Sequence, residues 1–483
     1  MTSITRIHEL LVSKKASAAE IAEQYVAAAE RDNPEMKAYI TITREAALSA
    51  ARAVDEKIAR GEELSPLAGV PFNMKDLIST AGVRTTCASK MLEDYVPFYD
   101  AAVWEALQTQ DAVMVGKGNM DEFAMGSTNK TSYFGAPLNP RDKSRVPGGS
   151  SGGVAAAVAG GTAVYGIGSD TGGSIRQPAA YCGVVGLKPT YGAVSRYGLI
   201  AFASSLDQIG PITANVRDAA IVLDAISDKD SRDMTSRGTA KVADRLTGEV
   251  RGLKIGIARE FFENLPSEIE NSVTASAKAL ENAGAQLVDV SFPMVRYGLP
   301  TYYILACAEA SSNLGRYDGL RFGHRAEDFR NLEDFIRKTR SEGFGAEVKR
   351  RILLGTYVLS SGYYDAFYNK AQQLRRAISN DFAKLFGTVD CLLTPTTPST
   401  ALRFDARLSP VEMYMTDICT VPINIAGVPA ISFPCGFDGE GLPIGAQLIG
   451  RKFDEATILN AALAFENATA SEFLRPANGG VSL

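Results

Sequence analysis

Short apolar runs and amphipathic helical stretches alternate along most of this chain. Apolar runs bounded by turn signals predict buried strands, and they lie at residues 67–74, 112–115, 163–167, 253–258, 286–290, 391–394, 430–434 and 444–449. Patterns with helical periodicity lie between them, at residues 18–29, 46–60, 154–159, 268–283 and over most of 302–385. This alternation indicates an α/β protein with a mixed β-sheet core covered by helices.

The N-terminal segment, about residues 1–65, is expected to be helical and to pack on the rest of the chain. Within it, Ser17 is a suitable N-cap for one helix and Gly61 a suitable end for another. The polar run 227–241 is expected to be an exposed loop. Because no Pro-, Ser- or Gly-rich linker divides the sequence and no repeat is visible, we expect one large domain over residues 1–483.

Composition narrows the class of protein. Of the 483 residues 46% are apolar and 22% charged, which is typical of globular proteins. The net charge of −5 argues against nucleic-acid binding by the surface as a whole. The start lacks a signal-peptide pattern, and no long apolar run could span a membrane. The six cysteines are scattered without a Cys-x-x-Cys pair. We therefore expect a cytoplasmic enzyme, or one of an organellar matrix or stroma if the source is eukaryotic.

Histidine is nearly absent, which excludes several kinds of site. The chain holds only His8 and His324, the first in an amphipathic helix and the second in a polar stretch. A Ser-His-Asp triad needs an imidazole to accept the serine proton, and a histidine-rich metal site needs several such side chains. We expect no metal site, and a serine nucleophile here must use another base.

Glycine and serine are concentrated between residues 147 and 176. The segment opens with PGGSSGG at 147–153 and continues with GSDTGGSIR at 168–176. It lacks the Gly-Lys-Ser/Thr ending of a phosphate loop. As an oxyanion hole, the amides of Thr171, Gly172, Gly173 and Ser174 would face the negative charge that forms on a carbonyl oxygen. Two flexible turns without a function are the third reading.

Lysine is the remaining candidate base. A lysine amine has a pKa near 10.4 and must be brought down by about three units to be neutral at pH 7. Lys75 follows the apolar run 67–74, so its backbone leaves a predicted core strand and partial burial is expected. An ordinary lysine at a strand end is the alternative.

The two glycine-rich segments, followed by QPA at 177–179, are similar to the signature of the amidase family, and the spacing from Lys75 agrees. The resemblance implies a single amidase domain with a signature core at about residues 66–215. It also implies a triad of Lys75, Ser150 in a cis peptide, and the nucleophile Ser174. Neutral Lys75 would deprotonate Ser150, and Ser150 would deprotonate Ser174.

Further motifs resemble one subgroup of that family, the amidase components (A subunits) of tRNA-dependent amidotransferases. They are NMDEFAMG at 119–126, KPTYG at 188–192, SSLDQIGP at 204–211 and EGFGAEVKRRI at 342–352. The resemblance implies glutamine as ammonia donor and a heterotrimer with subunits B and C. In that complex Glu-tRNA(Gln) is amidated with ATP and Mg²⁺ in the partner, and this chain itself holds no cofactor.

The same resemblance implies the glutamine contacts. An arginine fork suits the α-carboxylate and an aspartate the ammonium, and Arg351 and Asp417 are the candidates, with Tyr302 a third. Arg350 and Tyr303 are adjacent alternatives. A stand-alone amidase of small amides and a catalytically dead scaffold remain as other functions. Whether Asp-tRNA(Asn) is also used is not decided by these motifs.

Overall fold

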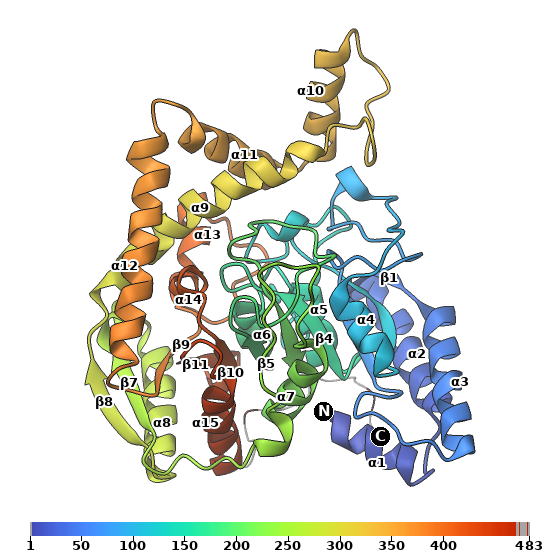
Figure 1. The fold of residues 1–483 in the computed structure, drawn as a ribbon, viewed down its shortest axis with the longest axis vertical. Coiled ribbons are helices and arrows are strands. Elements are labelled where there is room, and N and C mark those ends of the chain that lie inside the picture. Colours follow the sequence, from blue (N-terminus) through green and yellow to red (C-terminus); the bar gives the residue numbers. More distant parts are fainter. Residues whose placement is uncertain (1, 470–472, 474–480, 482–483) are drawn as a thin grey trace.

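Eleven strands form one mixed sheet that runs through the molecule (Figure 1). The computed structural model describes residues 2–469, 473 and 481. In spatial order the strands are β1, β3, β2, β4, β6, β5, β10, β11, β9, β7 and β8. Their bounds are β1 (Tyr39–Ile42), β2 (Pro71–Lys75), β3 (Val113–Gly118), β4 (Tyr165–Ser169), β5 (Val185–Lys188), β6 (Ile209–Thr213), β7 (Lys254–Ala258), β8 (Gln286–Val290), β9 (Cys391–Pro395), β10 (Ala430–Phe437) and β11 (Pro443–Gly450).

The sheet is parallel in two places and antiparallel elsewhere. Strands β3, β2 and β4 run parallel, as do β9, β7 and β8, and the remaining neighbours are antiparallel. Every strand predicted from the sequence overlaps one of these. Strands β1, β5 and β6 were not predicted, and β1, which pairs with β3, lies within the segment 1–65 that was expected to be helical. The predicted class, an α/β protein with a mixed sheet, is confirmed.

Helices pack around this sheet and extend beyond it. Those of the described residues are α1 (Ile4–Val12), α2 (Ala18–Met36), α3 (Arg44–Arg60), α4 (Ala102–Thr109), α5 (Gly152–Ala159), α6 (Arg176–Cys182), α7 (Val216–Ile226), α8 (Ser267–Asn282), α9 (Gly298–Asn313), α10 (Leu332–Gly343), α11 (Ala346–Leu359), α12 (Lys370–Leu385), α13 (Pro410–Met415), α14 (Val421–Ala426) and α15 (Glu455–Ala468). In Figure 1, α2 and α3 flank one end of the sheet, α8 and α12 the other, and α10 stands out at the top.

Helix α2 begins, and helix α3 ends, at the capping residues that the sequence predicts. The Ser17 hydroxyl accepts a hydrogen bond from the Glu20 amide at 3.1 Å, and the Glu20 carboxylate closes a capping box on the Ser17 amide. Gly61 follows α3 in the left-handed conformation, with φ 74°. Residues 227–241 form an irregular loop that is exposed only in part, since Ser227, Asp233 and Ser236 are buried and the Asp233 carboxylate accepts a hydrogen bond from the Arg196 amide.

Helix α5 lies unusually close to the sheet, and this closeness positions the glycine-rich segment. All residues of α5 are buried, and most are alanine or glycine. A Cβ atom on Gly166 of β4 would come within 2.2 Å of the Val154 side chain, and one on Gly118 of β3 within 2.7 Å. Because neither strand carries a side chain there, the N-terminus of α5 can approach the ends of β2 and β4.

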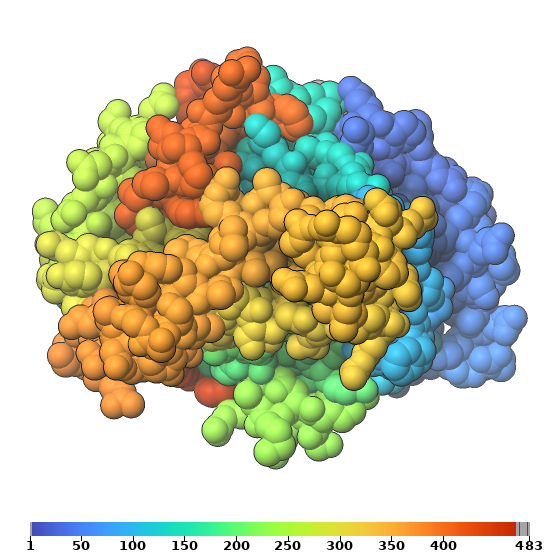
Figure 2. All heavy atoms as spheres, turned by 90° about the horizontal axis from the view of Figure 1, so that it is seen from above, coloured from blue at the N-terminus to red at the C-terminus, as the bar shows by residue number. Residues whose placement is uncertain are grey.

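Helices α9 to α12 form a cover on the side where these strands end. Seen from above, the gold and orange segment that holds α10, α11 and α12 spreads across the middle of the face (Figure 2). It lies between the blue N-terminal part and the yellow-green part near residue 270. None of the helices in the described part of the chain has the length and apolarity that a membrane span needs.

Candidate active site

The predicted base and its predicted relay lie in contact at the end of strand β2. Lys75 is the last residue of β2 and is fully buried. Its Nζ donates to the Ser150 Oγ at 2.7 Å and to the Ser169 Oγ at 2.9 Å. Ser169 ends β4, the parallel neighbour of β2. Carboxyl ends of parallel strands share one edge of a sheet, which is where α/β proteins commonly place their sites.

The loop around Ser150 is held by hydrogen bonds from both sides. The Gly149–Ser150 peptide bond is cis, as the family resemblance implies. The Ser150 carbonyl accepts from the Asp121 amide at 3.2 Å, and the Gly149 amide donates to Gln177 Oε1 at 2.9 Å. Ser150 therefore has little freedom to move away from Lys75.

The predicted nucleophile, Ser174, lies on the loop between β4 and α6, next to the Ser150 segment. The Ser174 carbonyl accepts a hydrogen bond from the Ser151 amide at 3.2 Å. Ser174 is 8% exposed, whereas Lys75 and Ser150 are 0% exposed. The structure thus brings the three predicted residues into one site, with the serine assigned to attack as the most accessible of them.

Burial gives Lys75 the proton affinity that a general base needs. Loss of hydration lowers the pKa of the Lys75 amine to about 7, although the negative charges of Asp121, Asp170 and Asp207 act in the opposite direction. A lysine with this pKa is substantially neutral at neutral pH, so it can accept a proton from Ser150.

The predicted role of Lys75 as a base has a pH dependence that follows from this value. With the neutral amine of Lys75 as the predicted base, we expect kcat to fall about tenfold per unit as pH drops below about 7 and to level off above it. Steady-state measurements of kcat between about pH 5 and pH 9 test this fall. A kcat that stays constant from neutral pH to about pH 5 would contradict Lys75 as the base.

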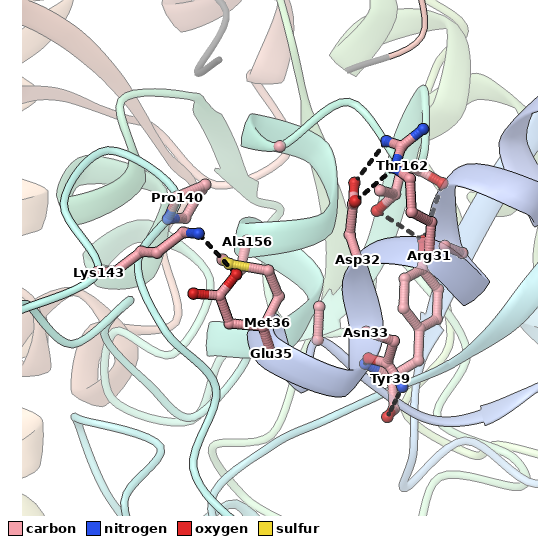
Figure 3. A pocket seen from close by; sticks show the side chains of 13 residues that line it. Arg31, Asp32, Asn33, Glu35, Met36, Tyr39, Pro140, Lys143, Ala156 and Thr162 are labelled. Carbon is pink, nitrogen blue, oxygen red and sulfur yellow. Dashed lines mark hydrogen bonds and ion pairs between the residues drawn. The ribbon is translucent and has the colours of Figure 1, made fainter. Parts of the chain in front are cut away.

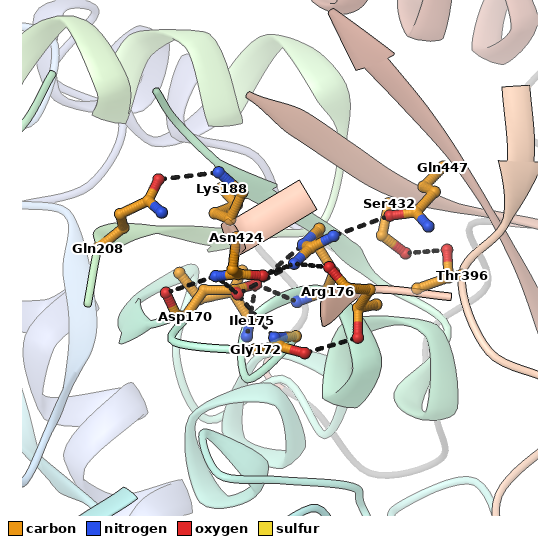
Figure 4. A network of polar contacts seen from close by, with 12 residues as sticks. Asp170, Gly172, Ile175, Arg176, Lys188, Gln208, Thr396, Asn424, Ser432 and Gln447 are labelled. Atoms are coloured by element: carbon orange, nitrogen blue, oxygen red, sulfur yellow. Dashed lines mark hydrogen bonds and ion pairs between the residues drawn. The ribbon is translucent and has the colours of Figure 1, made fainter. Parts of the chain in front are cut away.

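The predicted oxyanion hole is a loop fixed from behind by a buried ion pair. The Asp170 carboxylate accepts from the Gly173 amide at 2.8 Å and from the Arg176 Nε at 3.0 Å. Figure 4 shows Arg176 also reaching Asn424 and Gln447. Breaking a buried pair of this kind typically costs about 3–5 kcal/mol, so the loop is held firmly in place.

Within this loop the amides divide into two groups. The Gly173 amide is engaged by Asp170, so it is not available for an oxyanion in this arrangement. The amides of Thr171, Gly172 and Ser174 donate to no group within the described residues. Fixed, unpaired N–H groups beside a nucleophile are suited to stabilise developing negative charge. Three of the four predicted amides therefore remain candidates.

The residues predicted to bind glutamine gather beside that loop. A Cβ atom on Gly172 would lie 2.6 Å from the Tyr302 hydroxyl, so the Tyr302 ring packs directly on the loop. Asp417 is buried, and its Oδ2 accepts from the Ser127 hydroxyl at 2.7 Å and the Tyr303 hydroxyl at 3.2 Å. Burial raises the pKa of the Asp417 carboxyl to about 7. A positively charged ligand group nearby would favour its ionised form.

Arg351 belongs to this cluster, and the adjacent Arg350 does not. The Arg351 side chain is 3% exposed, and its guanidinium carbon lies 5.2 Å from the centre of the Tyr303 ring. The Arg350 side chain is 49% exposed. Neighbouring residues on a helix point about 100° apart, so only one of the two faces the site. Ser127 and Ser169 were not predicted, because their roles depend on contacts distant in sequence.

Two cavities are lined by residues other than these, and the second includes Thr416 and Ile418, the sequence neighbours of Asp417. One, of about 170 Å³, lies between α2, β1 and α5 (Figure 3), and ion pairs Lys143–Glu35 and Arg31–Asp32 lie at its wall. Another, of about 350 Å³, is lined by apolar side chains such as Phe261. No group of three or more His, Cys, Asp or Glu suited to a metal ion occurs in the part of the chain that the structure describes.

This chain matches the amidase family and the A subunits of glutamyl-tRNA(Gln) amidotransferases. Residues 20–459 match the family model for amidase. The chain is 54% identical to the A subunit of glutamyl-tRNA(Gln) amidotransferase from Carboxydothermus hydrogenoformans, over 98% of each chain. It is 53% identical to the protein of the same name from Koribacter versatilis, over 95% of this chain and 96% of that one.

Solved structures give a similar result. The A subunit of glutamyl-tRNA(Gln) amidotransferase from Thermotoga maritima superposes with a TM-score of 0.80 at 40% identity, covering 96% of this chain and 94% of that one. The peptide amidase of Stenotrophomonas maltophilia superposes with a TM-score of 0.84 at 29% identity, covering 99% and 98%.

Proposed function

We propose, since this chain belongs to the amidase signature family, that it is the glutamine-hydrolysing A subunit of a glutamyl-tRNA(Gln) amidotransferase. The observation that carries the proposal is the fully buried Lys75, whose Nζ lies 2.7 Å from the Ser150 Oγ. It occurs in a chain more than half identical to proteins of that name over nearly their full length. The overall reaction is that of a carbon–nitrogen ligase with glutamine as nitrogen donor.

We give the three side chains the order that the family resemblance implies, and the 2.7 Å contact between Lys75 Nζ and Ser150 Oγ supports its first step. Neutral Lys75 takes the proton of Ser150 as Ser150 takes the proton of Ser174. The Ser174 Oγ then bonds to the carboxamide carbon of glutamine. The amides of Thr171, Gly172 and Ser174 stabilise the resulting oxyanion. When the C–N bond breaks, the proton returns through Ser150 to the leaving nitrogen, and ammonia departs. Water attacks the acyl-enzyme by the same relay and releases glutamate.

Substrate binding uses opposite charges at the two ends of the amino acid group. The buried Arg351 guanidinium suits the α-carboxylate, and the buried Asp417 carboxyl, ionised when a positive group binds beside it, suits the ammonium. Tyr302 packs between that loop and the neighbouring Tyr303. An amide that lacks either charged group would leave one of these side chains without its partner.

The released ammonia is used by partner proteins in this proposal. Subunits B and C would complete a heterotrimer, with ATP and Mg²⁺ activating Glu-tRNA(Gln) for amidation at the partner. The acidic balance of this chain, −5, agrees with leaving tRNA binding to a different component of the complex. The complex would serve protein biosynthesis in the cytoplasm, or in an organellar matrix or stroma.

Reconstitution tests the proposal directly. The chain co-expressed with its genomic neighbours should co-purify with two of them and convert Glu-tRNA(Gln) to Gln-tRNA(Gln) only with both glutamine and ATP. The isolated chain should prefer glutamine to asparagine, acetamide and benzamide. If it instead behaves as a fully active monomer that prefers acetamide or benzamide, the chain is a stand-alone amidase and the proposal is wrong.

A further inference from the structure

Glu347, on the first turn of α11, lies behind the arginine that is proposed to bind the glutamine carboxylate. Its Oε1 accepts from the Arg351 Nε at 2.8 Å and from the Tyr414 hydroxyl at 2.9 Å. Its Oε2 pairs with Arg350 on the outer face of the helix. The Glu347 side chain is only 14% exposed, so these contacts form with little competition from water.

The guanidinium that Glu347 holds has its other donors free. An arginine side chain carries one N–H at Nε and four at the two Nη atoms. Within the described residues, Glu347 is the only hydrogen-bond partner of Arg351, and it uses the Nε. The rings of Phe202, Tyr303 and Tyr414 lie 5.6, 5.2 and 5.5 Å from the guanidinium carbon. The aromatic rings confine the guanidinium without engaging its Nη groups.

The geometry leaves a defined edge of the guanidinium for a ligand. A carboxylate binds arginine best through two parallel hydrogen bonds, which require a particular edge to be presented. If nothing held the Nε, the guanidinium could turn about its last bonds among three rings that attract it similarly. A partner on the Nε therefore selects which two N–H groups face the site, and Tyr414 fixes that partner in turn.

We infer that Glu347 is a positioning residue for recognition of the substrate's α-carboxylate, acting through Arg351. The inference rests on the proposed function, in which Arg351 binds that carboxylate. Glu347 makes no contact with the substrate itself in this account. Its role is to hold the guanidinium so that the two Nη groups meet the carboxylate together, which makes the site selective for amides that carry one.

The test compares substrates that differ by one charged group. The full-length enzyme, purified with its partner proteins, is assayed for ammonia release from glutamine, glutaramate (glutamine without the ammonium) and 4-aminobutanamide (glutamine without the carboxylate). Glu347→Ala should lower kcat/KM by about tenfold for glutamine and glutaramate, mainly through KM. It should change the value for 4-aminobutanamide by less than about twofold, because that substrate makes no use of Arg351.

Graded variants support the same interpretation. Glu347→Gln keeps an oxygen that can accept from the Arg351 Nε, so it should retain kcat/KM to within about threefold. Tyr414→Phe removes only the second hydrogen bond to Glu347 and should give a small loss of the same selectivity, which carries the test if Glu347→Ala is insoluble. Thr356→Ala, on the exposed face of α11 where the Thr356 hydroxyl donates only to the Ile352 carbonyl, is the matched control and should leave all three substrates unchanged.

Three results would overturn the inference, and only the third also contradicts part of the proposed function. If Arg351→Ala abolishes the preference for glutamine over 4-aminobutanamide but neither Glu347→Ala nor Tyr414→Phe alters it, Glu347 is not a positioning residue and the proposed function stands. The same holds if Glu347→Ala lowers all three substrates equally. If Arg351→Ala leaves the preference intact, the proposed carboxylate contact is wrong and the inference fails with it.

Discussion

Replacing Ser174 with alanine is expected to lower kcat for glutamine hydrolysis by about 10⁴-fold or more, with no loss of folding. The hydroxyl is the proposed attacking group, and the other hydroxyl on the loop between β4 and α6, that of Thr171, donates to Asp207 at 2.6 Å instead. Only the oxyanion donors and the bound geometry would remain to assist attack by water. Ammonia release, together with intact-protein mass after exposure to glutamine, measures both the rate and the missing acyl-enzyme.

A neighbouring serine provides the control for this variant. The Ser151 hydroxyl donates to the Ser169 carbonyl at 3.2 Å and lies in the same glycine-rich segment. Ser151→Ala therefore removes an equal number of atoms from the site while keeping the three proposed catalytic side chains, and should cost less than about a hundredfold. If Ser174→Ala retained more activity than Ser151→Ala, Ser174 would not be the nucleophile.

Replacing Lys75 with arginine should remove the base while keeping a positive charge. The arginine side chain does not lose its proton in proteins, so it cannot accept one from Ser150. We expect kcat to fall by about 10³-fold, within the range of lost general-base catalysis. The kcat of this variant should also no longer show the fall below about pH 7 that the lowered pKa of Lys75 predicts for the original enzyme. Rate measurements across pH test both effects in one experiment.

Lys117 offers a matched control, since it is a second buried lysine on the adjacent strand β3. Its Nζ donates to the Ile78 carbonyl and the Thr85 hydroxyl, each at 2.7 Å, and it contacts neither Ser150 nor Ser169. Lys117→Arg is expected to lower the melting temperature, while its kcat should still fall below about pH 7 as in the original enzyme. A Lys75→Arg enzyme with more than a tenth of the original kcat would show that Lys75 is not the base.

Much of the site could be predicted from local sequence because its parts carry local signals. The glycine-rich segments around Ser150 and Ser174 and the strand that ends at Lys75 are contiguous patterns, and most strands and helices follow from their apolar spacing. The near absence of histidine is enough by itself to exclude the commonest serine-hydrolase base. Assignment of Lys75 as the partner of Ser150, however, came from family resemblance, since nothing local distinguishes it from an ordinary lysine at a strand end.

The remaining features depend on groups that meet only in the folded chain. Ser169 contacts Lys75 because β2 and β4 are parallel neighbours, and Ser127 reaches Asp417 across 290 positions of sequence. Arg350 and Arg351 are chemically identical, and only the packing of α11 places one inside and the other outside. Asp170 engages the Gly173 amide, which reduces the predicted oxyanion donors from four to three. Periodicity reports which residues are buried, whereas the partner each buried polar group finds is set by long-range packing.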